Sequence, residues 1–553
     1  MSMAHTTPAD ARKAASLLLL RDGESGMEVL MLRRAERDGD LRSGAAVFPG
    51  GVVDARDREA HALCLGADDA SMSGRLGLDL GGLDYAVAAV RETFEEVGLL
   101  LVDGDFEASA IEPWRRRLQA GQGSFAEFCR EHGLSLDLRE LHYYSHWLTP
   151  PGVPKRFDTR FFAALAPPGQ QAVADMGEAL ELMWLTPQAA LDPARGLKLL
   201  PVTKRTLEEL ARHSDAAAAM GAIRERQAIG LTMPRRAMSS RGPRILLPDE
   251  WAYAEVARLD PEGRGDVACE LLPGRAVRLS ARVLRITAPN PGVMTGPGTN
   301  SYLVSDPQPG SGGWTLIDPG PESAAHGQTI LDALEGLQGR LTRILVTHTH
   351  VDHSPGAAAL AKATGAPVFG RFAVYPERQD ASFAPQRELV DGERLVLGAS
   401  TTLRVIHTPG HASNHLCYLL EEEKTLFTGD HVMQGSTVVI NPPDGDMRAY
   451  LAALHALQNE DLEWLAPGHG FLVGQPQVVL AGLIAHRLRR EAKVVSALQA
   501  AGVPAPIDAF LPSVYDDVPI GLHPVARRSL LAHLLKLAQD GRATVSGELW
   551  SAA

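Results

Sequence analysis

The feature that most constrains this sequence is a short histidine-rich stretch in its second half. Three histidines and one aspartate (His348, His350, Asp352 and His353) fall within six residues and directly follow the apolar run Ile344–Val346. A strand that ends in such a loop directs several side chains at one point. Imidazole nitrogens suit zinc, iron and similar divalent ions, and a carboxylate adds a hard oxygen ligand. The stretch predicts a metal site, because a loop of purely hydrogen-bonding histidines accounts poorly for the H-x-H-x-D-H spacing.

Three more residues of ligand type follow in chain order. His411 ends the stretch His407–His411, Asp430 ends Thr425–Asp430, and His469 lies between two glycines. Each lies beside Gly or Pro after a strand-like run, where loops carry chemistry. With these motifs, the region from about Arg282 to Gly470 resembles the metallo-β-lactamase superfamily.

This resemblance implies a site for two metal ions, zinc by preference and manganese or iron as substitutes. Two metals that share a hydroxide lower its pKa and stabilise an oxyanion. The ligand set of the first ion would be His348, His350 and His411, and that of the second Asp352, His353 and His469. Asp430 would bridge the ions, and Asp352 would also orient the nucleophile. With a carboxylate at Asp430, the site is similar to that of the hydrolases of phosphodiesters, thioesters and lactones rather than to that of true β-lactamases.

A second candidate site lies in the first half, in the stretch Arg91–Gly98. On a helix, Glu92, Glu95 and Glu96 share one face. Three carboxylates on one face repel one another unless a cation lies among them, and such oxygen ligands suit Mg²⁺ or Mn²⁺. The alternative is an ordinary solvated acidic face of a helix.

With Gly51 as its first glycine, this stretch resembles the Nudix box, split here by an insertion within residues 54–85. The stretch Leu41–Gly51 also resembles the acyl-CoA diphosphatase branch of Nudix enzymes. The resemblance implies an α/β/α sandwich in which the three glutamates bind metal, Glu95 and Glu96 are catalytic, and a diphosphate is hydrolysed. A downstream carboxylate, Glu178 or Glu181, would assist. The first glutamate of the box has no clear equivalent near Leu83, where counting back from Arg91 places it.

Composition limits the remaining classes. The 553 residues suffice for about three domains, and the net charge of −13 argues against broad nucleic-acid binding. The four cysteines are scattered and predict a reducing compartment. No apolar run reaches membrane-spanning length and no signal peptide is evident, so we expect a cytoplasmic protein without membrane association.

We expect three domains. Residues 1–270 would form the Nudix-like domain, 271–480 a metallo-β-lactamase αββα sandwich, and 481–553 a small winged-helix-like tail. Within them, residues 199–223 predict a helix and residues 233–244 a loop. The tail combines a basic helix, a Leu-rich helix and a short strand. Phosphate binding and a purely structural role remain equally open for its basic residues, which are Arg487, Arg489, Arg490 and Lys493.

Three functions remain open. The first is a two-headed hydrolase with a Nudix site for CoA-like diphosphates and a second site for a thioester or ester. The second is a single-strand endoribonuclease with a degenerate Nudix half, because Asn290–Met294, Pro442–Met447 and Ala485–Arg487 resemble the β-lactamase-like protein 2 branch. The third is a scaffold with relic sites. We expect a small-molecule phosphate or thioester substrate, with RNA as the alternative. Dimers are common among such enzymes, although no residue here argues for one.

Overall fold

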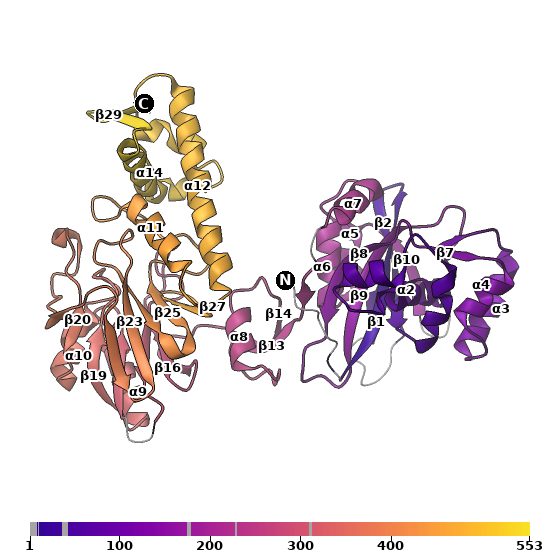
Figure 1. The fold of residues 1–553 in the computed structure, drawn as a ribbon, viewed down its shortest axis with the longest axis horizontal. Coiled ribbons are helices and arrows are strands. Elements are labelled where there is room, and N and C mark those ends of the chain that lie inside the picture. Colours follow the sequence, from indigo (N-terminus) through magenta and orange to yellow (C-terminus); the bar gives the residue numbers. More distant parts are fainter. Residues whose placement is uncertain (1–7, 9, 36–42, 174–178, 227–228, 309–311) are drawn as a thin grey trace. The chain divides into compact units, whose positions relative to one another are not determined.

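The computed structural model describes residues 8, 10–35, 43–173, 179–226, 229–308 and 312–553. Its contacts divide the chain into two compact units (Figure 1). The first unit holds Met1–Arg236, Arg244–Pro248 and Glu262–Gly265. The second holds Ala237–Pro243, Asp249–Pro261 and Asp266–Ala553. The domain boundaries expected at 270 and 480 stay predictions, and each unit is described by itself.

The first unit is built on one nine-stranded sheet. Its strand order is β11-β3-β2-β1-β9-β8-β12, with β10 paired to β2 and β4 paired to β1. The strands are β1 (Ala11–Gly23), β2 (Gly26–Arg34), β3 (Ala45–Val47), β4 (Gly50–Val52), β8 (His142–Leu148), β9 (Arg156–Leu165), β10 (Ala179–Leu185), β11 (Lys198–Leu199) and β12 (Leu231–Thr232). The parallel pair β1–β9 lies in the middle of the sheet.

Helices cover both faces of this sheet. Side chains alternate along β1, so Leu17 and Leu19 join the core under α2 (Gly82–Val97), while Leu18 and Leu20 join the core on the other face. The second face is covered by α5 (Pro187–Leu191), α6 (Pro201–Leu210) and α7 (Ala216–Arg224). The unit is therefore the expected α/β/α sandwich.

The inserted segment and the stretch that follows α2 together build a small layer beside this helix. The layer contains a short sheet of order β5-β7-β6, to which the insertion contributes β5. The elements are η1 (Ala55–Leu63), β5 (Cys64–Leu65), α1 (Asp69–Leu76), β6 (Val102–Asp103), α3 (Ala108–Gln119), α4 (Phe125–Glu131) and β7 (Ser135–Asp137). Asp54 caps η1 in a capping box with Asp57. This cap fixes the start of η1 next to β4.

Two local predictions were wrong. The helix expected over 199–223 is split into α6 and α7, because Asp215 accepts from the N–H of Ala218 and starts a new helix. The loop expected over 233–244 contains β13 (Arg235–Ser239) and the start of β14 (Gly242–Leu246). The turn at Ser240 and Arg241 joins the two strands, and β14 begins at Gly242 with a positive φ. The Pro and Gly content of the stretch had suggested a loop.

The second unit contains two sheets packed face to face. One has the order β15-β16-β17-β18-β19-β20-β21 and the other β22-β23-β24-β25-β26-β27. The first sheet consists of β15 (Ala276–Arg278), β16 (Val283–Thr287), β17 (Asn300–Ser305), β18 (Gly313–Ile317), β19 (Arg340–Leu345), β20 (Val368–Gly370) and β21 (Arg387–Glu388). The second consists of β22 (Arg394–Gly398), β23 (Thr401–His407), β24 (Leu416–Leu420), β25 (Thr425–Gly429), β26 (Trp464–Pro467) and β27 (Val473–Gly474).

Three apolar cores define its layers. The central core joins residues of both sheets, such as Val304 and Val405. A second core places α9 (Ala324–Gly336) and α10 (Gly356–Thr364) outside the first sheet. A third places α11 (Met447–Leu457) and the start of α12 (Pro476–Ala501) outside the second sheet. These layers form the expected αββα sandwich.

One helix before the sandwich belongs to it. Glu255 on α8 (Tyr253–Leu259) forms two hydrogen bonds of 2.5 and 2.8 Å with Arg285 of β16. The same carboxylate accepts from the N–H of Leu472 at 2.8 Å. Glu255 and Arg285 are each 2% exposed, so this ion pair is fully inside the second unit.

The C-terminal part combines helices with a small sheet. Its elements are α12, β28 (Ala505–Pro506), α13 (Leu511–Val514), α14 (His523–Gln539), β29 (Ala543–Ser546) and β30 (Leu549–Ala552), and the sheet order is β28-β30-β29. A separate core unites α12, α13 and α14 with Trp550. The predicted boundary at 480 falls inside α12. Among the described residues, no helix combines the length and apolar character needed to cross a bilayer.

Candidate active sites

The predicted metal ligands of the second unit all follow strands and meet at one end of the two sheets. His348, His350, Asp352 and His353 follow β19, which lies parallel to β18. The other three follow strands of the second sheet, with His411 after β23, Asp430 after β25 and His469 after β26. Since β25 and β26 run parallel, Asp430 and His469 emerge side by side. Residues from His348 to His469, 121 positions apart in the sequence, are thus brought together.

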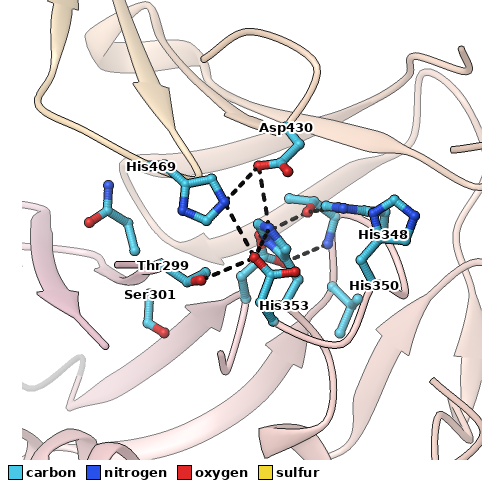
Figure 2. A network of polar contacts seen from close by, with 12 residues as sticks. Thr299, Ser301, His348, His350, His353, Asp430 and His469 are labelled. Carbon is cyan, nitrogen blue, oxygen red and sulfur yellow. Dashed lines mark hydrogen bonds and ion pairs between the residues drawn. The ribbon is translucent and has the colours of Figure 1, made fainter. Parts of the chain in front are cut away.

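The structure gathers both predicted ligand triads. In His348, His350 and His411, and again in Asp352, His353 and His469, the potential ligand atoms lie within 4.8 Å of one another. Asp430 lies between the triads. Its Oδ1 is 3.3 Å from His353 Nε2 and 3.2 Å from His469 Nε2, and its Oδ2 is 3.7 Å from His411 Nε2. Figure 2 shows His469, Asp430 and His353 pointing toward one another.

The residues present fit divalent metal ions. Four buried ligand atoms lack a hydrogen-bond partner among the described residues, namely Nε2 of His348, His353 and His469 and Oδ1 of Asp430. A buried polar atom without a partner costs about 1–3 kcal/mol, so four that converge on one point are unfavourable in a purely structural role. Imidazole and carboxylate donors satisfied by a shared cation remove this cost.

The electrostatics of the cluster agree with that conclusion. Burial and the neighbouring His353 hold the pKa of His348 well below its ordinary value, and burial lowers that of His350 to about 3. Both rings are therefore neutral, as ligands must be. Burial would raise the pKa of Asp430, but His469 and His353 hold it well below its usual range. Burial opposes charge on His469, yet Asp430 and Asp352 raise its pKa to about 9. Positive charge is favoured between these carboxylates.

One important residue was missed by the sequence analysis. Asp318, at the end of β18, accepts hydrogen bonds from the N–H and Oγ1 of Thr347 at 2.7 and 2.8 Å and lies 2.9 Å from His353 Nδ1. This contact leaves His353 Nε2 free to face the site. The signal was a polar residue at the end of a buried strand that runs parallel to β19.

The remaining histidines are placed around the ligands. His415 Nε2 accepts from the N–H of Asp430 at 3.2 Å, and its Nδ1 lies 2.9 Å from Thr408 Oγ1. His407 Nε2 lies 3.1 Å from the carbonyl of Ser413. Both support ligand loops rather than contribute to the ligand triads.

The first unit carries the predicted carboxylate face on α2. Glu92, Glu95 and Glu96 line a cavity of about 560 Å³ together with Arg91. Glu96 accepts from the N–H of Gly50 at 2.9 Å. A Cβ on Gly51 would lie 2.4 Å from the Glu92 carboxyl, so only glycine permits this approach. Burial first, then Glu95, raises the pKa of Glu92 to about 7 against the opposing effect of Arg91.

Asp57, which the sequence analysis did not single out, stands at the spacing of the first box carboxylate and contacts Arg91. Its Oδ1 accepts from Arg91 Nε at 2.7 Å, and Arg91 also contacts Glu92 at 2.9 Å and Glu95 at 3.3 Å. Asp57 lies six positions after Gly51, where the box has its glutamate. Counting back from Arg91 crosses the inserted residues and reaches Leu83, which is buried in the apolar core. Asp84 pairs instead with Arg58 at 3.1 Å.

Two other sets of predicted residues are placed differently from the sites. Glu181 is exposed on β10, and Glu178 lies outside the described residues, as do Leu41 and Arg42. In the tail, Arg490 pairs with Asp517 and Lys493 contacts Asp516. Of the four basic residues on α12, Arg489 is exposed, while Arg487 is buried.

This fold and this site define a class of metal-dependent hydrolases, and sequence comparisons agree. Residues 294–469 match the metallo-beta-lactamase superfamily, 80–199 the NUDT19 Nudix domain, and 507–550 the beta-lactamase associated winged helix domain. The chain belongs to the metallo-β-lactamase superfamily and carries a Nudix domain before that fold. The predicted recognition and fold class are thereby confirmed, and the two domains support a hydrolase that uses divalent metals.

Individual relatives cover parts of the chain. The atrochrysone carboxyl ACP thioesterase nsrC of Aspergillus novofumigatus is 30% identical over 48% of this chain and 81% of its own length. An atrochrysone carboxyl ACP thioesterase of Aspergillus fumigatus is 33% identical over 40% of this chain and 66% of its own length, slightly less than two thirds. A NUDIX hydrolase of Alicyclobacillus acidocaldarius has a solved structure that is 28% identical, with a TM-score of 0.34, over 40% of this chain and all of its own.

Proposed function

We propose that the second unit hydrolyses a thioester or a related ester, using two zinc ions held by His348, His350 and His411 and by Asp352, His353 and His469, with Asp430 shared. The observation that carries the proposal is the cluster of buried histidine and carboxylate ligand atoms, four of which make no hydrogen bond among the described residues. Divalent ions in such a site activate water at neutral pH and stabilise the oxyanion of an acyl transfer. The curated relatives named as thioesterases support the choice of bond.

The chain's own groups supply orientation. Asp352 accepts a hydrogen bond from Thr299 Oγ1 at 3.3 Å and lies 3.3 Å from His469 Nε2 (Figure 2 shows Thr299 and His469). Burial, the largest single effect, raises the pKa of Asp352, but His353 and His469 together outweigh it and hold the pKa below its usual value. The carboxylate therefore stays ionised and orients the attacking water by accepting its hydrogen bond.

The surroundings favour an apolar acyl group. Large apolar side chains are exposed on the loops that carry or contact the ligands: Val293 is 85% exposed, Val351 is 70% and Val374 is 69%. Val351 lies between two ligands, and the N–H of Val374 donates to Ser413, close to His411 in the sequence. Exposed apolar side chains beside a polar site are typical of small-molecule binding.

The charge of the protein argues against RNA as the substrate. A polyanion needs unpaired cations, and the net charge is −13. On α12, Arg490 and Lys493 already pair with Asp517 and Asp516. Two of the four basic residues on α12, for which phosphate binding and a structural role were equally open, therefore already pair with carboxylates of the C-terminal part.

For the first unit we propose hydrolysis of a diphosphate in CoA or an acyl-CoA, with Mg²⁺ or Mn²⁺ held by Glu92, Glu95 and Glu96. The acidic cavity and the contact of Arg91 with Asp57 support it. In this proposal Glu95 and Glu96 hold the metal beside the attacking water. The two units would then act on one metabolite at two different bonds.

Product analysis separates these proposals. Purified protein would be incubated with an acyl-CoA and, separately, with single-stranded RNA, in the presence of zinc and Mg²⁺. Free CoA, lost in Asp352→Ala, is the expected product of the second unit. Acyl-phosphopantetheine with adenosine 3′,5′-bisphosphate, lost in Glu95→Gln, is the expected product of the first. Cleaved RNA beside intact acyl-CoA would refute the thioester proposal and favour the ribonuclease.

A further inference from the structure

His411 is oriented by a backbone group that lies outside the ligand loops. Its Nδ1 lies 2.9 Å from the carbonyl oxygen of Val439. Because a carbonyl can only accept, Nδ1 carries the proton, and Nε2 presents its lone pair to the site. That Nε2 lies 3.0 Å from His350 Nδ1, within the all-histidine triad. The direction of the lone pair therefore depends on where the Val439 carbonyl is held.

The carbonyl of Val439 and the N–H of Ile440 belong to the same peptide unit. The N–H of Ile440 donates to Oγ of Ser529, on α14, at 3.3 Å. A peptide unit is planar, so fixing its N–H end also fixes the direction of its carbonyl. Ser529 thus acts on His411 through a single peptide plane.

Arg487, on α12, holds the preceding peptide unit. Its guanidinium donates to the carbonyl of Val438 and lies over the ring of Tyr450, with Cζ 5.3 Å from the ring centre. Arg487 is 3% exposed and Ser529 is 6% exposed. Among the described residues, Arg487 forms no ion pair with a carboxylate within 4.0 Å. Burying a guanidinium without such a partner is unfavourable, and the hydrogen bond to Val438 offsets part of that free-energy cost.

We propose that Arg487 and Ser529 are positioning residues of the metal site. The two C-terminal helices hold both peptide units that flank Val439, and these set the tautomer and the direction of the His411 ring. This gives the tail a role in hydrolysis that requires no contact with substrate. The inference rests on the proposed metal site, so the experiment must distinguish a failure of the inference from a failure of the metal site.

The experiment measures metal binding, not only turnover. Full-length protein would be stripped of metal and titrated with Zn²⁺ against a chromophoric chelator, and with Co²⁺ by visible absorption. The variants are Ser529→Ala and Arg487→Met, with Ser529→Thr and Arg487→Lys as variants that keep the hydroxyl or the donor. Arg489→Met, an exposed change on the same helix, is the matched control.

We expect Ser529→Ala and Arg487→Met each to lower the affinity for one of the two ions about tenfold or more, because replacing the partners of metal-ligating histidines has effects of that size. Both variants should also change the Co²⁺ spectrum. Ser529→Thr and Arg487→Lys should restore most of the affinity, and Arg489→Met should match the parent. If Arg487→Met does not fold, the two Ser529 variants still decide the question. Equal affinity for both ions in Ser529→Ala and parent would overturn the inference alone, whereas a parent that binds no metal would overturn the site as well.

Discussion

Replacing Asp318 by Asn tests whether the position of the ligands depends on a carboxylate that binds no metal. Asp318 Oδ2 accepts from Thr347 Oγ1 and faces Nδ1 of His353 at 2.9 Å. An amide nitrogen at that place would face the Nδ1–H of His353 donor to donor. The ring can escape only by moving its proton to Nε2, which removes a lone pair from the site.

The size of the effect follows from these contacts. One buried hydrogen bond to a charged acceptor is lost, so the free energy of unfolding of the metal-free second unit should fall by about 1.5–3 kcal/mol. The affinity for the ion bound by Asp352, His353 and His469 should fall by about 10–100-fold. Asp332→Asn, on the exposed face of α9, is the control and should change neither quantity.

The assay combines urea unfolding of the stripped protein with stepwise Zn²⁺ titration of parent and variant. A selective loss of one ion, with the other bound as in the parent, agrees with the reasoning. An Asp318→Asn variant that binds both ions with parent affinity would refute it, because His353 would then not depend on Asp318 for its tautomer.

Two further substitutions test other buried contacts. Glu255→Ala leaves Arg285 as a buried charge without its bidentate partner, so the second unit should lose about 3–5 kcal/mol of stability in urea unfolding; a loss below 1 kcal/mol would contradict the importance of that pair. Asp57→Asn removes the charge that holds Arg91 between the Nudix glutamates, so Mn²⁺ affinity of the first unit should fall about tenfold or more, whereas Asp84→Asn should leave it unchanged. Equal effects of the two changes would contradict our assignment of the box carboxylate.

The sequence was informative where ligands stand in contiguous motifs. His348, His350, Asp352 and His353 lie in one loop, so their convergence needs no knowledge of tertiary structure. Asp318 could not be assigned in this way, because its role depends on the parallel pairing of β18 with β19.

Backbone groups and substituted positions were harder to predict. The carbonyl of Val439 has no residue-specific signal at all. Asp57 was overlooked because the Nudix pattern requires Glu and because we measured the spacing backward across the insertion.

For the basic helix, phosphate binding and a structural role were left equally open by the sequence. Its buried positions include Leu480, Ile484, Val494 and Leu498, and the same face includes Arg487. Spacing of three and four residues already indicated that this arginine faces inward. The position of an arginine on the helix, rather than its residue type, therefore determines whether its side chain is buried.

The central claim is that the second unit needs its metal ions to cleave a thioester. The most direct test follows thiol release from an acyl-CoA by chelator-stripped protein as Zn²⁺ is added back in measured equivalents. The account predicts background release without metal, recovery as the two sites fill, and no recovery in Asp352→Ala. Thiol release that is unchanged by stripping, or that is equal in Asp352→Ala and parent, would contradict it.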